Sequence, residues 1–189
     1  MSFEEQVSES SQIFSVSQSE RKNVRFQRYM EDAHSVIPCL NDDPGVFYAS
    51  VFDGHGGIFE CISLICVGRE TADFVNARLP KNLINALSSG EMETIEQCLE
   101  YAYYFTDIES KNEDMKNSGS AGVTVLLLNE EDQRVLYSAN AGDSRSVLFA
   151  DGKTIRLSYV GAVVCVDVRI IRPPIPLKKN GLQIWEASS

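Results

Sequence analysis

Residues 46–57 read VFYASVFDGHGG, and this stretch decides the fold. The segment from Val46 to Phe52 is rich in β-branched and aromatic side chains, and it follows the turn-forming run NDDPG at residues 41–45. Such a run after a turn signal predicts a buried strand. The strand is expected to end before Asp53, in a polar and glycine-rich loop over residues 53–57.

The segments after this loop predict two helices. Apolar residues recur at helical spacing and predict an amphipathic helix over 70–88. Pro80 is expected to kink or divide this helix, because proline removes a backbone hydrogen bond. A second helix is expected over 92–116. Its apolar face is expected to carry Ile95, Leu99, Ala102 and Phe105.

Three further strands are expected after a break at residues 118–120. They are 123–128, 135–141 and 144–149. Gly142-Asp143 and Asp151-Gly152 are turn signals that follow the second and third of them, so an antiparallel meander is expected. A strand, two helices and then a meander favour an α+β fold over a doubly wound sheet.

Two acidic stretches carry the candidate chemistry: Glu31-Asp32, and Asp53 at the end of the predicted strand. Carboxylate oxygens suit hard cations such as Mg²⁺ and Mn²⁺, and Gly54 lets a backbone carbonyl approach an ion. Two ions about 3.5–4 Å apart can share one water and activate it for attack on phosphorus. His55, beside such a centre, could protonate the leaving oxygen. The alternative interpretation is a solvated acidic pair, a turn at Asp53-Gly54 and an ordinary loop histidine.

Composition excludes several classes of protein. A net charge of −10 disfavours a nucleic-acid binder and docking on an anionic membrane. No stretch approaches the roughly 20 apolar residues of a membrane span, and the N-terminal residues do not resemble a secretory signal. The 5 cysteines have no CxxC spacing, so reduced thiols and an intracellular location, cytoplasmic or nuclear, are expected. Residues 1–20 are expected to form a flexible tail, and no oligomerisation motif is present, so a monomer is expected.

Four motifs resemble one known family. They are RYMEDAH at 28–34, VFYASVFDGHGG at 46–57, SANAGDSRSVL at 138–148 and ADGKTIRLS at 150–158. In this order they are similar to the N-terminal part of the PP2C (PPM) family of metal-dependent serine/threonine protein phosphatases. The resemblance covers residues 24–158 and implies part of an α-β-β-α sandwich with a two-metal site, using Mn²⁺ or Mg²⁺ and acting on phosphoproteins.

The resemblance also implies roles for single residues. Asp53 would bridge both metals, and Gly54 would bind one of them through its carbonyl. Glu31 and Asp32 would act largely through metal-bound waters, and His55 would be the general acid. Asp143 matches a position associated with a third metal in some members, and its alternative interpretation is a hairpin-turn residue.

The sequence departs from the family in two places. Gln27 stands where the family places a phosphate-binding arginine, so Arg25 or Arg28 would have to bind the phosphate. After Ser158 the expected DHKP-like segment and the later SDG and DN motifs, which supply metal-binding aspartates, do not follow. The sheets are therefore expected to lack strands, to expose unpaired edges and to form no active site.

Two segments suggest an origin for these departures. Residues 169–189, read one frame away, can spell a DHKP-type continuation, so 159–168 is interpreted as a retained intron that shifts the frame. Residues 58–68 (IFECISLICVG) are interpreted as an in-frame insertion, because removing them joins DGHGG to RETADFVNARLP. The alternative is a genuine apolar helix extension at 58–68 and a divergent terminus at 159–189.

Three functions remain open at this point. The first is a protein serine/threonine phosphatase, with this chain inactive for want of the C-terminal aspartates. The second is a non-catalytic pseudophosphatase that serves as a binding module. The third is a mis-spliced product with no function of its own.

Overall fold

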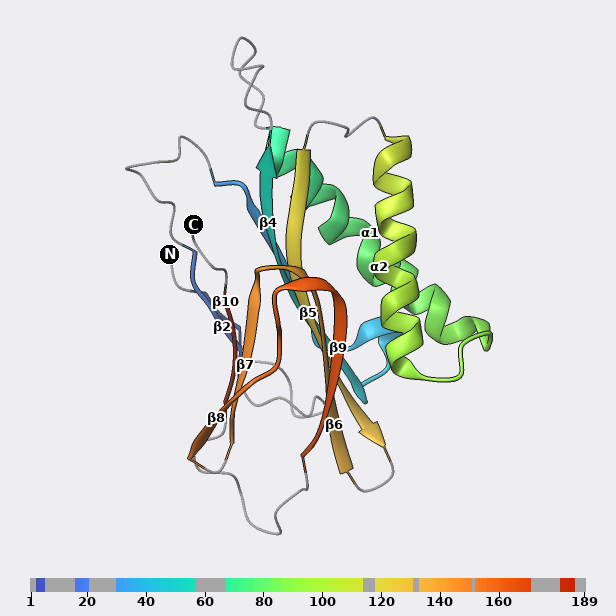
Figure 1. Cartoon of the computed structure of the whole chain (residues 1–189). Coiled ribbons are helices and arrows are strands. Elements are labelled where there is room, and N and C mark those ends of the chain that lie inside the picture. The colour runs from blue at the N-terminus through green and yellow to red at the C-terminus, as the bar shows by residue number, and fades with distance from the viewer. Residues whose placement is uncertain are drawn as a thin grey trace.

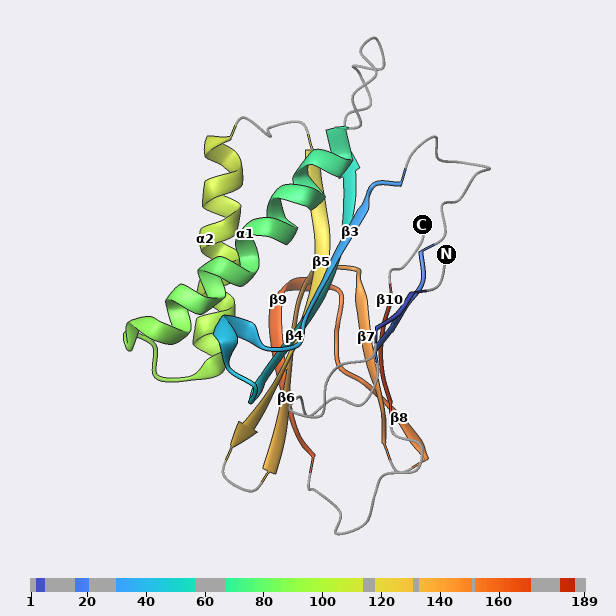
Figure 2. The same ribbon diagram turned by 180° about the vertical axis from the view of Figure 1, so that it is seen from behind.

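The computed structural model describes residues 3–5, 16–20, 30–56, 67–113, 118–130, 133–150, 152–170 and 181–185. They form three layers: two helices, a five-stranded sheet and a three-stranded sheet (Figure 1). The view from behind shows the same order, with both helices on one face of the larger sheet and the smaller sheet beyond its other face (Figure 2). The α+β class and the partial sandwich are confirmed.

The larger sheet is antiparallel throughout. In sheet order its strands are β3 (Asp32–Ile37), β4 (Val46–Gly56), β5 (Ser118–Glu130), β6 (Gln133–Gly142) and β9 (Gly161–Ile170). A short 3-10 helix, Leu40–Asp42, connects β3 to β4. The prediction of a loop over 53–57 is wrong for residues 53–56. These residues continue β4, and Gly56 pairs with Ser118 of β5. Backbone pairing here outweighs the weak strand preference of glycine.

The smaller sheet corrects the expected meander. It is made of β10 (Gly181–Trp185), β7 (Arg145–Ala150) and β8 (Lys153–Arg156), in that order. β6 does not pair with β7, since the chain leaves one sheet at Gly142 and enters the other at Arg145. Gly142 has a φ of 90°, which glycine adopts most readily. The turn signal at Gly142-Asp143 therefore marks a crossing between sheets.

The two helices run close to their predicted ranges. α1 spans Val67–Ser89 and α2 spans Ile95–Asn112. Thr94 begins α2 with a capping box, in which its side chain and that of Gln97 each accept from the other's backbone amide. Pro80 does not divide α1. The φ that proline imposes is itself helical, and Pro80 is buried, so packing offsets the missing hydrogen bond.

The buried face of α2 differs from the expected one at one position. Leu99 and Ala102 are buried, but Phe105 is 37% exposed. Phe105 lies about 120° around the helix from Leu99, so it cannot share the stripe that faces the sheet. Tyr103 and Thr106 take the place that was expected for Phe105.

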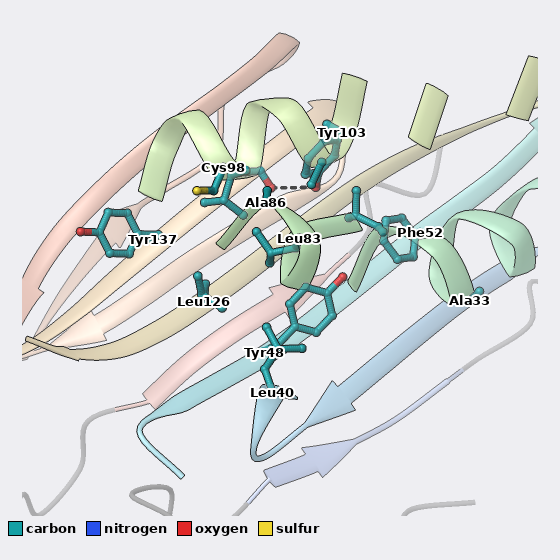
Figure 3. Close-up of a cluster of buried hydrophobic side chains, with 14 of the residues drawn as sticks. Ala33, Leu40, Tyr48, Phe52, Leu83, Ala86, Cys98, Tyr103, Leu126 and Tyr137 are labelled. Carbon is teal, nitrogen blue, oxygen red and sulfur yellow. Dashed lines mark hydrogen bonds between the residues drawn. The ribbon is translucent and has the colours of Figure 1, made fainter. Parts of the chain in front are cut away.

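Two apolar clusters hold the layers together. One lies between the helices and the larger sheet, where Tyr48, Phe52 and Leu83 are at most 1% exposed (Figure 3). The other lies between the sheets and contains Phe47 and Ala49. Alternate residues of β4 thus serve opposite faces, as in any strand. Each fully buried large side chain contributes about 1.5–3 kcal/mol to folding.

Both ends of the chain supply strands where none were expected. Within the expected tail over 1–20, β1 (Phe3–Glu5) pairs with β2 (Val16–Gln18). Val16 also packs against the cluster between the sheets, which gives this segment an apolar anchor. In the segment 159–189, β9 pairs with β6 and β10 pairs with β7, so those two edges are covered. Among the described helices, none is both long and apolar enough to cross a bilayer.

Candidate functional site

The acidic residues of the two N-terminal motifs meet through the pairing of β3 with β4. Asp32 is the first residue of β3 and lies directly opposite Asp53. Directly opposed residues of an antiparallel pair point to the same face of the sheet. Glu31 immediately precedes Asp32, so three carboxylates gather at this end of the sheet. The sequence did not predict β3, and it could not assign this register.

Asp143 reaches the same end from a distant part of the sequence. Ala121 of β5 pairs with Asp53, and a Cβ added to Gly142 would lie 2.7 Å from the Ala121 Cβ. Gly142 therefore packs against Ala121, the residue that pairs with Asp53, and Asp143 is the next residue after Gly142. It also stands where the chain crosses between the sheets, which rules out its interpretation as a hairpin-turn residue.

Asp53 faces the space between the two sheets. Phe52 packs under the helices, so the alternation of β4 turns Asp53 to the opposite face, which it shares with Ala49. The side chain is half-buried. This position explains how a carboxylate on the larger sheet comes close to Asp143 at the crossing.

Burial and like charges raise the pKa of two of these carboxyl groups. For Asp53, burial has the largest effect and the charge of Asp32 the next largest, with smaller increases from Asp143 and Glu31. For Glu31, burial again comes first and Asp32 second. His55 lowers both pKa values, by less than burial or Asp32 raises them, and at Asp53 its effect exceeds those of Asp143 and Glu31. The carboxylates therefore repel one another in the absence of a cation.

His55 stands beside this cluster on the exposed end of β4. Its Nδ1 lies 3.3 Å from the backbone oxygen of Asp53. The ring lies over Gly119 of β5, where an added Cβ would be 3.0 Å from Nε2. An exposed imidazole next to a carboxylate cluster is suitably placed for proton transfer. Its role as a general acid stays a prediction.

Gly54 is required by close packing. A Cβ at this position would lie 2.2 Å from the backbone oxygen of Gly68 and 2.6 Å from that of Glu31. Any larger residue would push β4 away from the start of α1 and from the segment that carries Glu31. Gly54 thus keeps three parts of the chain together beside the carboxylates.

Arg69 is a positioning residue that the sequence did not reveal. One of its terminal guanidinium nitrogens donates to the backbone oxygen of Asp32 at 2.6 Å. Its Nε bonds both carboxylate oxygens of Asp73, at 2.9 and 3.0 Å. Arg69 and Asp73 are four residues apart on α1, and this spacing is a signal from which their ion pair could have been predicted. Nothing in the sequence indicated the contact with Asp32, because it joins α1 to a distant strand.

The donor set fits a hard divalent cation that keeps much of its water. Glu31, Asp32, Asp53 and Asp143 supply only oxygen, which Mg²⁺ and Mn²⁺ prefer. Within the described residues, no three Asp, Glu, His or Cys side chains converge closely enough to hold one ion directly. One or two carboxylates plus waters is a usual arrangement for Mg²⁺. Arg25 and Arg28, the predicted phosphate ligands, lie outside the described residues.

Comparison with known proteins places the chain among phosphatases. A family model described as "Protein phosphatase 2C" matches residues 16–161. "Protein phosphatase 2C homolog 1" of Schizosaccharomyces pombe is 33% identical over 145 residues, which cover 74% of this chain and 38% of the relative. The protein with the same description from Saccharomyces cerevisiae is 31% identical over 159 residues, covering 77% of this chain and 53% of the relative.

A solved structure shows the same fold. It is described as a C. elegans sex determining protein, with a TM-score of 0.53, 20% sequence identity, and coverage of 71% of this chain and 32% of that one. The 189-residue chain spans about 38% to 53% of the length of the two yeast relatives. The similarity to the two yeast proteins therefore concerns only part of the length of each of them.

Proposed function

The chain belongs to the protein phosphatase 2C family, and on this premise we propose that it carries part of the active site of a metal-dependent serine/threonine protein phosphatase. The observation that carries the proposal is the meeting of Asp32, Asp53 and Asp143 at one end of the sandwich. These residues come from three separate parts of the sequence, and only the sheet pairing brings them together. A cluster of repelling carboxylates costs folding free energy, which a functional cation would offset.

Mn²⁺ or Mg²⁺ bound at this site would neutralise the carboxylates and supply an activated water for attack on phosphorus. Asp53 and the Gly54 carbonyl would hold the cation, Glu31 and Asp32 would act largely through waters bound to it, and Asp143 would add negative charge from the crossing between the sheets. Arg69 fixes the backbone at Asp32. His55 gives its proton to the leaving oxygen of a phosphoserine or phosphothreonine. Arg25 or Arg28 would hold the phosphate.

We further propose that a polypeptide of these 189 residues has no phosphatase turnover. The family resemblance implies metal-binding aspartates in SDG and DN motifs, and residues 159–189 contain neither motif. Without these ligands the chain is expected to lack the second ion position, and with it the geometry of attack that two ions provide, while one cation can still bind at Asp53.

A non-catalytic binding module is the second candidate. The observation that favours it is the pairing of β9 with β6 and of β10 with β7, which leaves those edges covered. A chain in which both sheets gain these paired strands can fold and bind without turning over substrate. The proposal includes phosphoprotein ligands, a monomeric chain and an intracellular location. The free thiols of Cys39 and Cys98 agree with a reducing compartment.

The test is hydrolysis of p-nitrophenyl phosphate together with thermal unfolding, with and without Mn²⁺. We expect no Mn²⁺-dependent hydrolysis by the chain. We also expect Mn²⁺ at ten times its Kd to add about 1.4 kcal/mol of stability, or about 4 °C in Tm. Asp53→Ala should abolish the shift in Tm, and Glu100→Ala, at an exposed position of α2 away from the cluster, should keep it.

Two outcomes would count against the proposal. Hydrolysis that depends on both Mn²⁺ and Asp53 would refute the statement that the chain is inactive. An equal shift in Tm for the unmodified chain and Asp53→Ala would show that the cation binds elsewhere, and the carboxylate cluster would then lose its assigned role.

A further inference from the structure

A groove opens on the outer side of the helical layer, between α1 and α2. Its volume is about 390 Å³, within the range of about 300–1,000 Å³ that is usual for ligand sites. No described element covers this side of the helices (Figures 1 and 2). Gly68, near the start of α1, contacts Gly54 beside the carboxylate cluster. Arg78 of the groove is ten residues further along α1, which corresponds to about 15 Å at 1.5 Å per residue. The two sites are separate.

The floor of the groove is a fixed ion pair. Glu109 of α2 accepts from the Arg78 guanidinium through one carboxylate oxygen and from the Asn82 amide, at 2.8 Å, through the other. These contacts, the Asn82 bond first, lower the pKa of Glu109. Asn82 also donates to Thr106 at 2.9 Å. Glu109 therefore remains ionised, and both of its oxygens are already bonded.

The donors around this ion pair are left without acceptors. The Nε of Arg78 is buried and has no hydrogen-bond partner among the described residues. The Arg78 side chain as a whole is 43% exposed, so the rest of its guanidinium can be reached from the groove. Lys81 and Asn85 also line the groove, and neither side chain bonds any residue that the structure describes. The groove thus offers free positive charge and free N–H groups on a chain with a net charge of −10.

Aromatic side chains stand on the α2 side of the groove. Phe105 lines it, and its ring stacks on that of Tyr101 with the centroids 5.6 Å apart. Tyr101, Tyr104 and Phe105 are 38%, 66% and 37% exposed. Their spacing of three and four residues puts them on one face of α2. Exposed aromatic rings beside a cationic group are the usual anchors of protein interfaces.

We propose that this groove binds an acidic peptide segment of a partner protein. A carboxylate of the segment would accept from the exposed part of the Arg78 guanidinium and from Lys81 Nζ, and a neighbouring apolar side chain would pack on Phe105. The free groups of the groove are donors, so they select an acceptor with negative charge. The aromatic surface selects a ligand with an apolar side chain next to that charge, which a peptide supplies. This inference does not depend on the proposed phosphatase function.

The probe is a fluorescein-labelled peptide of Asp-Asp-Leu repeats, titrated with the full chain and followed by fluorescence anisotropy. We expect a Kd of about 10–100 μM, and binding at least about tenfold weaker for the same peptide with Asn in place of Asp. Lys81→Glu should weaken binding by about tenfold or more, and Phe105→Ser by about fivefold. Circular dichroism melting of each variant verifies that it is folded.

The chain offers a matched control for each variant. Lys153→Glu makes the same change in net charge at an exposed position of β8, on the opposite side of the molecule. Phe149→Ser removes a phenylalanine that is 38% exposed, against 37% for Phe105, and it also lies in the smaller sheet. Both controls should bind the probe as the unmodified chain does.

Several results would overturn the proposal. Equal weakening by Lys81→Glu and Lys153→Glu would mean that overall charge governs binding, and equal binding of the Asn peptide would mean that the carboxylates are not recognised. Displacement of the probe by inorganic phosphate at about 1 mM would identify a small-anion site. A dimer in sedimentation that Lys81→Glu dissociates would identify a second copy of this chain as the occupant.

Discussion

The fold favours the protonated form of Asp53, whereas the proposed cation site requires the ionised carboxylate. Burial and the charges of Asp32, Asp143 and Glu31 raise the pKa of Asp53 above its usual value of 3.8. A group whose pKa is higher in the folded than in the unfolded state contributes stability below the unfolded pKa. That contribution is lost as the pH rises through the folded value. At neutral pH, Asp53 therefore weakens the fold unless a cation is present.

Asp53→Asn is expected to stabilise the cation-free chain at neutral pH. The gain should be up to about 1 kcal/mol at about pH 7, a modest value because solvent screens a half-buried carboxyl. The gain should fall toward zero as the pH drops below 3.8, the usual pKa of an aspartate, since Asp53 is then protonated in both states. Urea unfolding across this pH range with a chelator present measures it.

Glu100→Gln is the control for this experiment, because Glu100 is an exposed residue of α2 that lies outside the cluster. It should leave the free energy of unfolding unchanged at every pH. If Asp53→Asn destabilises the chain at neutral pH, repulsion does not dominate at Asp53. A gain in stability that persists at low pH would instead point to packing of the amide and away from charge.

At the scale of single residues, sequence reasoning located the acidic positions but not their geometry. The motifs around Glu31, Asp32, Asp53 and Asp143 predicted these residues as a group, and the structure brings them to one end of the sandwich. The contact of Arg69 with the Asp32 backbone could not be predicted, since it depends on how α1 packs against β3. Phe105 was misplaced because helical spacing alone does not say which apolar stripe faces the core.

Among the elements, the junction between β4 and α1 gives the clearest test of the interpretation of 58–68 as an insertion. Gly68 packs against Gly54, and a Cβ on Gly68 would lie 3.0 Å from the Gly54 backbone. Removing residues 58–68 would place Gly57 directly before Arg69, in the position that Gly68 holds. Residues 54–57 would then form a four-residue turn, for which the φ of 117° at Gly56 is suitable.

The variant lacking residues 58–68 is therefore expected to fold with a Tm no lower than that of the full chain. A shorter connection costs less closure entropy, and a glycine remains next to Gly54. In this variant Gly57→Ala should cost about 1–3 kcal/mol, as Gly68→Ala should in the full chain. Thermal unfolding followed by circular dichroism measures both. A loss of cooperative unfolding in the shortened chain would show that 58–68 is a required part of the fold.

Helices and strands that are determined by the local sequence pattern were predicted well. Strands that are determined by pairing with a distant segment were predicted poorly. Helical spacing gave α1 and α2 to within a few residues, and β-branched runs gave β4, β5 and β6. β3 was missed because DAHSVI has no clear alternation, and it becomes a strand by pairing with β4. The extension of β4 through Asp53 and Gly54 likewise follows from pairing with β5.

On the scale of the whole molecule, residues 159–189 add one strand to each sheet although they do not resemble the family. β9 covers the edge of β6, and β10 covers the edge of β7. Exposed strand edges promote association between chains. The sequence alone predicted unpaired edges here, because the family motifs end at Ser158. The prediction was wrong because a segment without those motifs can still form a strand by backbone pairing.

Truncation after Ser158 is expected to leave a chain that aggregates and has no cooperative unfolding transition. It would uncover the edges of β6 and β7 and remove part of the pairing that stabilises each sheet. Size-exclusion chromatography and thermal melting measure the outcome. Removal of residues 186–189 alone, which leaves β9 and β10 intact, should have no such effect. If both truncations behave like the full chain, β9 and β10 contribute nothing to the fold.

The connection between β4 and β5 sets the order in which the site can assemble. β3 and β4 are joined only by a short 3-10 helix, so Asp32 and Asp53 meet in a local hairpin. β5 follows both helices in the chain and pairs with β4 only after a long loop has closed, which is a slow step in folding. During synthesis on the ribosome, the first two carboxylates can therefore come together before Asp143 has left the exit tunnel.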